Sequence, residues 1–224
     1  MMKRLVQPEL LDTLPPDNPR AIRSRRDLVR VNAWMGNPGI MSSALRENLR
    51  GVPGRIVELG AGDGNFLLRV ARKTGWKNID ATLLDLQKNI SDETLAAFAK
   101  LEWKATTVVA DVFEWEGSAD VIVANLFLHH FEDGRLAQLL EKISGRTRLF
   151  IAVEPHRFAF PWLCGQLLWA IGCNDVTRHD AIVSIRAGFI RRELSALWPA
   201  SANWQLTERR AGVFSHLFIA RRLS

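Results

Sequence analysis

The feature that most limits the fold of this chain is a glycine-rich turn between an apolar run and an amphipathic run. The stretch RIVELGAGDGNFLLRVA covers residues 55–71 and places glycines at every second position, at Gly60, Gly62 and Gly64. The run before the turn predicts a buried strand, and the run after it predicts a helix. A strand, a glycine turn and a helix at the start of a parallel sheet form a crevice that binds ligands.

The rest of the chain alternates between near-continuous Val/Ile/Leu runs and amphipathic runs. Such apolar runs are typical of parallel strands that helices cover on both faces. The order predicts a doubly wound α/β fold with a mostly parallel, seven-stranded sheet, closed by an antiparallel pair of strands near the C-terminus. The predicted strands cover residues 55–59, 79–85, 105–111, 119–126, 148–154, 203–210 and 212–222. The predicted helices between them cover residues 65–74, 91–101, 132–144 and 178–199.

Composition and punctuation predict how the chain is organised around this sheet. A length of 224 residues, 47% of them hydrophobic, suits one globular domain with a full core. Residues 1–51 are expected to form an N-terminal arm and a helical cap, irregular through residue 23 and helical from Ser24 onward. Residues 52–224 are expected to form the ligand-binding domain, with residues 156–179 as an insertion after the fifth strand.

The charges at the glycine turn indicate what kind of ligand it binds. Dinucleotide-binding chains carry the pattern G-x-G-x-x-G, whereas here Asn65 occupies the third glycine position and Gly64 comes one residue early. Glu58 and Asp63 flank the turn, which contains no lysine or arginine. These acids would repel a pyrophosphate and attract a ligand with cationic character. S-adenosylmethionine has that character, because it carries a sulfonium and an ammonium. An alternative role for Asp63 is to cap the following helix.

With this acidic glycine turn the chain resembles the class I S-adenosylmethionine-dependent methyltransferases, which open with an acid followed by G-x-G-x-G. The resemblance covers roughly residues 52–156 and points to the branch that acts on small molecules of the natural-product, quinone or phenol type. It implies a Rossmann-like methyltransferase fold, with S-adenosylmethionine as cofactor and S-adenosylhomocysteine as product. The cofactor-binding residues that it implies are Glu58, Gly60, Ala61, Gly62 and Gly64 in the turn, Asp85 and Leu86 at the ribose, Asp111 and Val112 at the adenine, and Asn125 and Leu126 at the methionine end and the substrate mouth.

Three histidines are candidate bases for the reaction. Methyl transfer is an in-line displacement, and a hydroxyl acceptor must also lose a proton. His130 and His129 follow the fourth predicted strand, and His179 lies in the motif TRHD. One member of the histidine pair could instead be a packing residue. The motif around His179 has an alternative role as a helix cap, with Asp180 favoured by the helix dipole.

The acceptor is expected to be hydrophobic. Residues 158–173 are almost wholly apolar and follow the fifth strand, where the resembling family often inserts a substrate lid. A phenol, polyketide-like or lipid-like acceptor, methylated on oxygen, suits such a lid; the alternative is that the segment is an ordinary core helix. The residues expected to contact the acceptor are Trp34, Met35, His156, Trp162, Trp169 and Arg178.

Charge and cysteine usage limit the partners and the setting. The formal net charge is +6, and five arginines fall between residues 20 and 30, which suits a solvated face, an acidic partner or peripheral contact with an anionic inner membrane. Nucleic acid is disfavoured because no aromatic residues alternate with the basic ones. Two cysteines nine residues apart form neither a zinc motif nor a disulfide framework, and no signal or membrane-spanning segment is apparent. A cytoplasmic enzyme, monomeric or homodimeric, is expected.

No metal is expected, because Asn125 and Glu154 are poor evidence for the magnesium site of catechol-type enzymes. The sequence leaves several alternative functions open. They are an RNA or protein methyltransferase, a C-methyltransferase of a quinone-type precursor, and a dehydrogenase or nucleotide binder on a similar fold.

Overall fold

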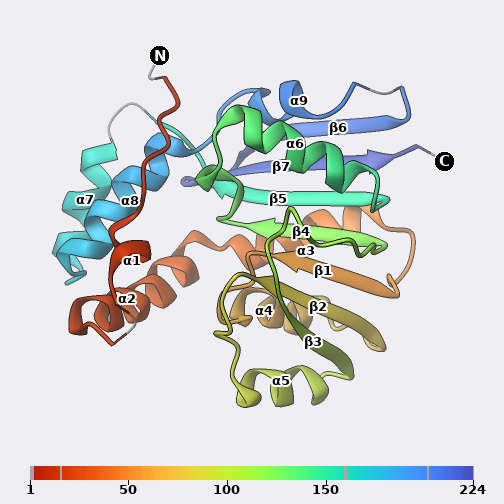
Figure 1. Cartoon of the computed structure of the whole chain (residues 1–224), viewed down its shortest axis with the longest axis horizontal. Helices are drawn as coiled ribbons and strands as arrows, with labels where there is room; N and C mark the ends of the chain where they lie inside the picture. The colour runs from red at the N-terminus through yellow and green to blue at the C-terminus, as the bar shows by residue number, and fades with distance from the viewer. Residues whose placement is uncertain (1–2, 16, 159–160, 201, 224) are drawn as a thin grey trace.

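A single seven-stranded sheet forms the centre of the molecule, with strand order β3-β2-β1-β4-β5-β7-β6 (Figure 1). The computed structural model describes residues 3–15, 17–158, 161–200 and 202–223. Neighbouring strands pair in parallel except at β7, which runs antiparallel to both β5 and β6. The predicted doubly wound, mostly parallel sheet is therefore confirmed. The strands are β1 Arg55–Leu59, β2 Ile79–Asp85, β3 Trp103–Val109, β4 Val121–Asn125, β5 Leu149–Pro155, β6 Trp204–Ala211 and β7 Ser215–Arg222.

Helices cover both faces of the sheet because successive residues of a strand point to opposite faces. On β1, Ile56 packs in the core formed with α3, α4 and α5, whereas Val57 and Leu59 pack in the core formed with α6 and α9. These helices are α3 Asn37–Asn48, α4 Asn65–Thr74, α5 Asp92–Ala99, α6 Asp133–Ser144 and α9 Glu193–Leu197, and a short 3-10 helix, η1, covers Leu128–His130.

The turn between β1 and α4 depends on glycine. Gly60, Gly62 and Gly64 have φ angles of 65°, 55° and 73°, a region that residues with a Cβ rarely adopt. At Gly60 space is limiting as well, since a Cβ there would lie 2.3 Å from Cδ2 of Phe127. The backbone of the turn can therefore approach a neighbouring ring or a ligand closely.

Four helices form a separate layer at the carboxyl ends of the parallel strands (Figure 1). They are α1 Leu10–Thr13, α2 Pro19–Met35, α7 Pro161–Ala170 and α8 Asp175–Ala187. Helix α8 contacts α7, α2 and α1, so the N-terminal segment and the insertion after β5 form one helical cap. No helix in the described part of the chain combines the length and the apolar character needed to cross a membrane.

The helical cap differs from the sequence prediction in two places. The segment expected to be irregular contains α1, and α2 begins at Pro19 rather than at Ser24. It begins there because the side chain of Asn18 accepts a hydrogen bond from the backbone N–H of Arg20, which caps the helix. The single helix expected over residues 178–199 is two helices, α8 and α9, with a break between them.

Contacts with the end of β5 cause this break. A Cβ on Gly188 would lie 2.3 Å from the carbonyl oxygen of Pro155, so only glycine fits there. The backbone N–H of Phe189 donates to the same oxygen at 2.9 Å, and the N–H of Arg157 donates to the Phe189 carbonyl at 3.1 Å. The chain at this point pairs with the end of the sheet, so these backbone groups cannot continue a helix.

Candidate active site

A cavity of about 350 Å³ lies between the glycine turn and the helical cap. Its lining is mostly apolar on the side of the cap and polar on the side of the sheet. From the cap it is lined by Leu28, Val31, Trp34 and Met35 of α2, by Cys164, Leu167, Leu168 and Ile171 in and after α7, and by Asp180, Ala181, Ser184 and Ile185 of α8. From the sheet edge it is lined by Glu58, Gly60, Ala61, Gly62 and Asp63, by Asn125 and Leu126, and by His129 and His130.

Glu58, the acid of β1, has a buried carboxyl group that lines this cavity. Its side chain is 2% exposed, and its Oε2 has no hydrogen-bond partner among the described residues. Burial, and then the charges of Asp63 and Asp85, raise the pKa of Glu58 well above its usual value. A buried acid with a free oxygen at the edge of a cavity favours a ligand group that carries positive charge or donates hydrogen bonds.

Asp85 holds the glycine turn in place from the end of β2. One carboxylate oxygen accepts a hydrogen bond from the N–H of Gly62 at 2.8 Å, and the other accepts from the N–H of Gln87 at 2.9 Å. Asp111 follows β3 and accepts from the N–H of Phe113 at 2.8 Å. Neither acid lines the cavity. Both lie at the carboxyl edge of the sheet, because β2 and β3 pair in parallel up to Asp85 and Val109.

Two further residues predicted at the cofactor lie beside these acids but outside the cavity lining. Leu86 is 69% exposed, whereas Val112 is 8% exposed and belongs to the core around α6. The positions would suit a ligand that extends from the cavity along the sheet edge.

The end of β4 is hydrogen-bonded to the start of α3 beside the cavity. The side chain of Asn37, which is buried at the start of α3, donates a hydrogen bond to Asn125 at 2.9 Å. Leu126 follows with a φ of 52°, although it is not glycine. Residues in this strained region cluster at ligand sites in proteins, and here the strain re-aims the chain toward η1.

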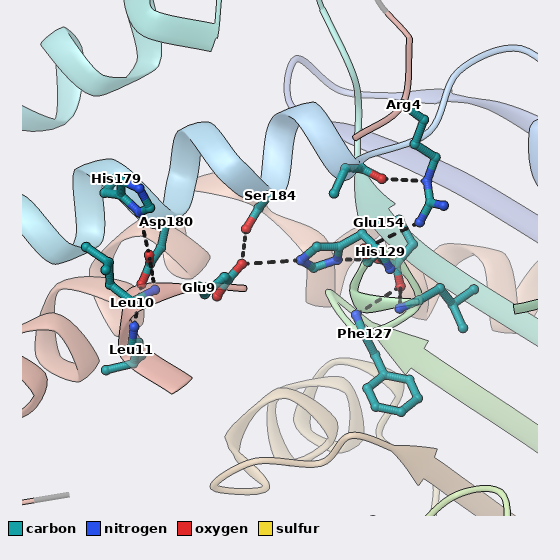
Figure 2. A network of polar contacts seen from close by, with 12 residues as sticks. Arg4, Glu9, Leu10, Leu11, Phe127, His129, Glu154, His179, Asp180 and Ser184 are labelled. Atoms are coloured by element: carbon teal, nitrogen blue, oxygen red, sulfur yellow. Dashed lines mark hydrogen bonds and ion pairs between the residues drawn. The ribbon is translucent and has the colours of Figure 1, made fainter. Parts of the chain in front are cut away.

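His129 is the centre of a buried polar network (Figure 2). Its Nδ1 is 2.8 Å from Oε2 of Glu154, and its Nε2 is 3.6 Å from Oε1 of Glu9. The other oxygen of Glu154 accepts hydrogen bonds from the N–H groups of Phe127 and Leu128. Glu154, which is completely buried, therefore fixes both the turn after β4 and the orientation of the His129 ring.

The two neighbouring histidines have opposite charge states. Burial disfavours the charged form of His129, but the contacts with Glu154 and Glu9 outweigh it and raise its pKa to about 9. The His130 ring stacks on that of His129, with centroids 4.3 Å apart, and it is accessible from the cavity. His130 is an exposed residue, but desolvation where its ring packs against the protein, and then the charge of His129, lower its pKa to about 4. At neutral pH the cavity therefore presents one charged and one neutral imidazole.

The structure places several predicted residues away from the cavity. His179 is exposed and directs its Nδ1 to Asp180 at 3.1 Å, and Arg178 on the same helix is not part of the lining. His156 pairs with the chain at Phe189 and stacks on His216 instead. Arg178 and His179 lie elsewhere because α8 directs residues 180, 181, 184 and 185 toward the cavity, whereas the bridge to Phe189 holds the chain at His156.

Trp169 of the predicted lid also does not line the cavity. Trp169 is 64% exposed on the outer side of α7. The side chain of Trp162 lies outside the described residues. Trp34 and Met35 do line the cavity, and Trp34 is 68% exposed at its mouth. The apolar insertion and the N-terminal helix thus both border the cavity. The residues of α7 that line it are Cys164, Leu167 and Leu168 rather than Trp169.

Sequence reasoning missed the residues that the N-terminal arm and α8 bring to the site. Glu9 lines the cavity and contacts His129, and the hydroxyl of Ser184 donates a hydrogen bond to Glu9. Asp180 accepts hydrogen bonds from the N–H groups of Leu10 and Leu11. Glu9 carries no local signal, because its neighbours in the site are more than a hundred residues away in the sequence.

Glu9, His129 and His130 are also the group among the described residues that a metal ion could share. One ligand atom from each lies within 4.8 Å of the others. Both ring nitrogens of His129 already face carboxylates, which satisfy the imidazole without an ion.

The chain matches one family model, described as a methyltransferase domain, over residues 56–148, which is less than half of its length. The matched region runs from β1 through α6 and includes the glycine turn and the histidine pair. No curated protein matches the chain in sequence.

Solved structures of methyltransferases share the fold. The plantazolicin methyltransferase BpumL in complex with SAH has a TM-score of 0.66 at 15% identity, with 92% of this chain and 91% of that chain covered. The mitomycin 7-O-methyltransferase MmcR has a TM-score of 0.62 at 16% identity, with 95% of this chain and 60% of that chain covered. An O-methyltransferase family protein from Burkholderia thailandensis has a TM-score of 0.58 at 16% identity, with 93% and 61% covered. The predicted methyltransferase fold is confirmed, and the domain match confirms the predicted class of enzyme.

Proposed function

We propose that this methyltransferase transfers the methyl group of S-adenosylmethionine to a hydroxyl group of a hydrophobic small molecule. The observation that carries the proposal is the buried Glu58 carboxylate, which borders a largely apolar cavity and keeps one oxygen without a partner among the described residues. An ammonium group would pair with that oxygen and lower the cost of ionising it. The open side of the glycine turn at Gly62 leaves room for the ligand beside it.

The methyl donor is supported by the domain match and by the structural neighbours, of which BpumL was solved with SAH. S-adenosylmethionine supplies an electrophilic methyl group on its sulfonium. In this chain, Glu58 would hold the ammonium, Asp85 would accept hydrogen bonds from the ribose hydroxyls, and Asp111 would lie near the adenine amino group. A carboxylate suits the ribose because it can accept from two hydroxyls at once.

The cavity's apolar side supports a hydrophobic acceptor. Side chains of α2, α7 and α8 face one another there, including Val31, Leu168 and Ile185. Each methylene of an acceptor buried between them would contribute about 0.8 kcal/mol to binding. A phenol with an apolar body would place its hydroxyl toward the polar side, where His129 and His130 lie.

Oxygen is the favoured methylation site because the polar side offers a route for a proton. His130 is neutral at neutral pH and accessible from the cavity, so it can accept a hydrogen bond from the acceptor hydroxyl. The charged His129 beside it would stabilise the phenolate that forms as the proton leaves. A base with a pKa near 4 is weak, so this electrostatic contribution is needed alongside proton transfer.

Two experiments test the proposal. Calorimetry with S-adenosylhomocysteine and with NADH should show binding of the first ligand alone; binding of NADH alone would refute the cofactor assignment. Incubation with CD3-labelled cofactor and a series of 3-alkylphenols should add one CD3 group in place of the phenolic hydrogen, with KM falling as the alkyl chain lengthens. Label attached to ring carbon would identify a C-methyltransferase, and a KM that ignores chain length would refute the apolar acceptor.

A further inference from the structure

The N-terminal arm is fastened to the catalytic domain by a buried arginine. The side chain of Arg4 is 9% exposed and pairs with Asp133 of α6 at 2.7 Å. It also donates hydrogen bonds to the carbonyl of Phe131, after η1, and to the carbonyl of Ala187, at the end of α8, both at 2.8 Å. The guanidinium lies over the ring of Phe189, 4.5 Å from its centroid. One side chain therefore fixes the arm to three separate elements next to the histidine pair.

A second attachment sets the position of the residue before α1. The carboxylate of Asp180, from the middle of α8, accepts hydrogen bonds from the N–H groups of Leu10 at 2.7 Å and Leu11 at 3.0 Å. These are the first two N–H groups of α1, which have no partner within the helix itself. Since Asp180 holds them from across the fold, Glu9 is placed at the cavity rather than in solvent (Figure 2).

Two side chains contact the carboxylate of Glu9, and both do so at the same oxygen. The hydroxyl of Ser184 donates a hydrogen bond to Oε1 of Glu9, and the same oxygen lies 3.6 Å from Nε2 of His129. The His129 ring cannot turn away, because Glu154 binds its other nitrogen at 2.8 Å. Glu154, His129 and Glu9 thus form a line from the buried end of β5 to the cavity.

We propose that Glu9 is a positioning residue of the methyl-transfer site, supplied by the N-terminal arm to fix the orientation and charge of His129. This inference rests on the proposed function. It extends the reaction site beyond residues 56–148, because neither Glu9 nor its supports Arg4 and Asp180 lie in that region.

Electrostatics around the network support this role. The groups that face His129 are Glu9 from the arm, Glu154 from β5 and the neighbouring His130 ring. The charge of Asp180, from α8, raises the pKa of His130. The guanidinium of Arg4 donates to a backbone carbonyl nearby. Burial alone would favour the acid form of Glu9, but contact with His129 outweighs it and lowers the pKa of Glu9. The pair is therefore ionised on both sides. Loss of one carboxylate within 4–6 Å shifts a neighbouring pKa by about 1–3 units.

Glu9→Gln is the decisive variant, because glutamine keeps the size and can still accept the hydrogen bond from Ser184 but removes the charge. We expect an NMR titration to show the pKa of His129 falling by about 1–3 units from about 9. The kcat should fall at least 10-fold, but by less than the roughly 10²–10⁴-fold that a proton-transfer group itself contributes, because Glu9 acts through His129. Affinity for S-adenosylhomocysteine should stay unchanged. Glu9→Asp, which keeps the charge but shortens its reach, should recover part of the loss in pKa.

The matched control is Glu47→Gln, which neutralises an exposed glutamate on α3, away from the cavity. It should leave both the His129 titration and kcat as in the unmodified protein. An unchanged His129 pKa in Glu9→Gln, or an unchanged kcat, would overturn the role of Glu9. Loss of wild-type activity in EDTA, with recovery on adding Zn²⁺, would also overturn it, since Glu9 would then be a metal ligand. The NMR readout needs no acceptor, so failure of the inference is distinguishable from failure of the proposed function, in which the wild-type protein itself would transfer no methyl group.

Discussion

Replacing Gly62 by alanine tests whether the glycine turn holds the ligand or only connects β1 to α4. Gly62 has a φ of 55°, and an added Cβ would meet no protein atom within 4 Å. The new methyl group would therefore project into the open space of the cavity that Gly62 lines. The substitution has two separable effects, one on the backbone and one on the bound ligand.

The backbone effect follows from the φ angle. Holding a residue with a Cβ in the left-handed region costs about 1–2 kcal/mol. For a chain of this size each 1 kcal/mol lowers Tm by about 2–4 °C, so Gly62→Ala should lower Tm by roughly 2–8 °C. Gly75 provides the matched control, because it ends α4 with a φ of 65°, has equally open space and does not line the cavity. Gly75→Ala should lower Tm by a similar amount.

The ligand effect should distinguish the two variants. A methyl group forced into a packed contact costs about 1–3 kcal/mol, which is about 5- to 150-fold in affinity. We expect calorimetry with S-adenosylhomocysteine to show this loss for Gly62→Ala and normal affinity for Gly75→Ala. Equal affinities in the two variants, at matched losses of Tm, would refute the assignment of Gly62 to the ligand site.

Three further predictions follow from the acids and the histidines. Asp85→Ala should weaken S-adenosylhomocysteine binding by about 1.5–3 kcal/mol, because it removes a charge-assisted acceptor and also frees the N–H of Gly62; unchanged calorimetric affinity would remove Asp85 from the site. The pKa of Glu58 is raised in the folded state, so the unfolded state loses the Glu58 proton at a lower pH than the folded state does. The free energy of unfolding of the ligand-free protein therefore falls as the pH rises above 4.5, the ordinary pKa of a glutamate. Glu58→Gln should therefore gain Tm relative to wild type on going from pH 4 to pH 8 while losing cofactor affinity, as thermal scans across pH and calorimetry would show; a Tm difference that does not vary with pH would contradict the shift. His130→Ala should lower kcat by about 10²–10⁴-fold with little change in cofactor affinity, whereas His179→Ala, outside the cavity, should turn over normally; equal activities of the two variants would exclude His130 as the base.

The part of the fold that could be predicted from the sequence is the part that local patterns determine. The predicted bounds of β1, β2 and α4 agree with the structure, because apolar runs define the strands and left-handed glycines at Gly64 and Gly75 limit the helix. The break after α8 could not be predicted in this way. Its sequence continues a helical pattern across Gly188, and only the contact with the carbonyl of Pro155 ends the helix there.

The two sides of the cavity also differ in how far the sequence predicts them. The side toward the sheet comes from the ends of parallel strands, where the glycine turn and the acid Glu58 before it are recognisable in the sequence. The side toward the cap comes from helices packed together across the fold, and their sequence shows that they are apolar but not which residues face inward. On α7, Leu168 and Cys164 line the cavity, whereas Trp169 does not.

The matched methyltransferase domain by itself leaves the cavity incomplete. Residues 56–148 supply the glycine turn and the histidine pair, but α2, α7 and α8 supply most of the apolar lining, and the arm supplies Glu9. Methyl transfer requires the acceptor to lie in line with the sulfonium, so its orientation depends on surfaces that the matched domain does not contain. It follows that changes in the cap should alter which acceptor is used, and how well, while leaving cofactor binding intact. We therefore expect the cap helices α2, α7 and α8, rather than the glycine turn, to determine which acceptor this chain uses.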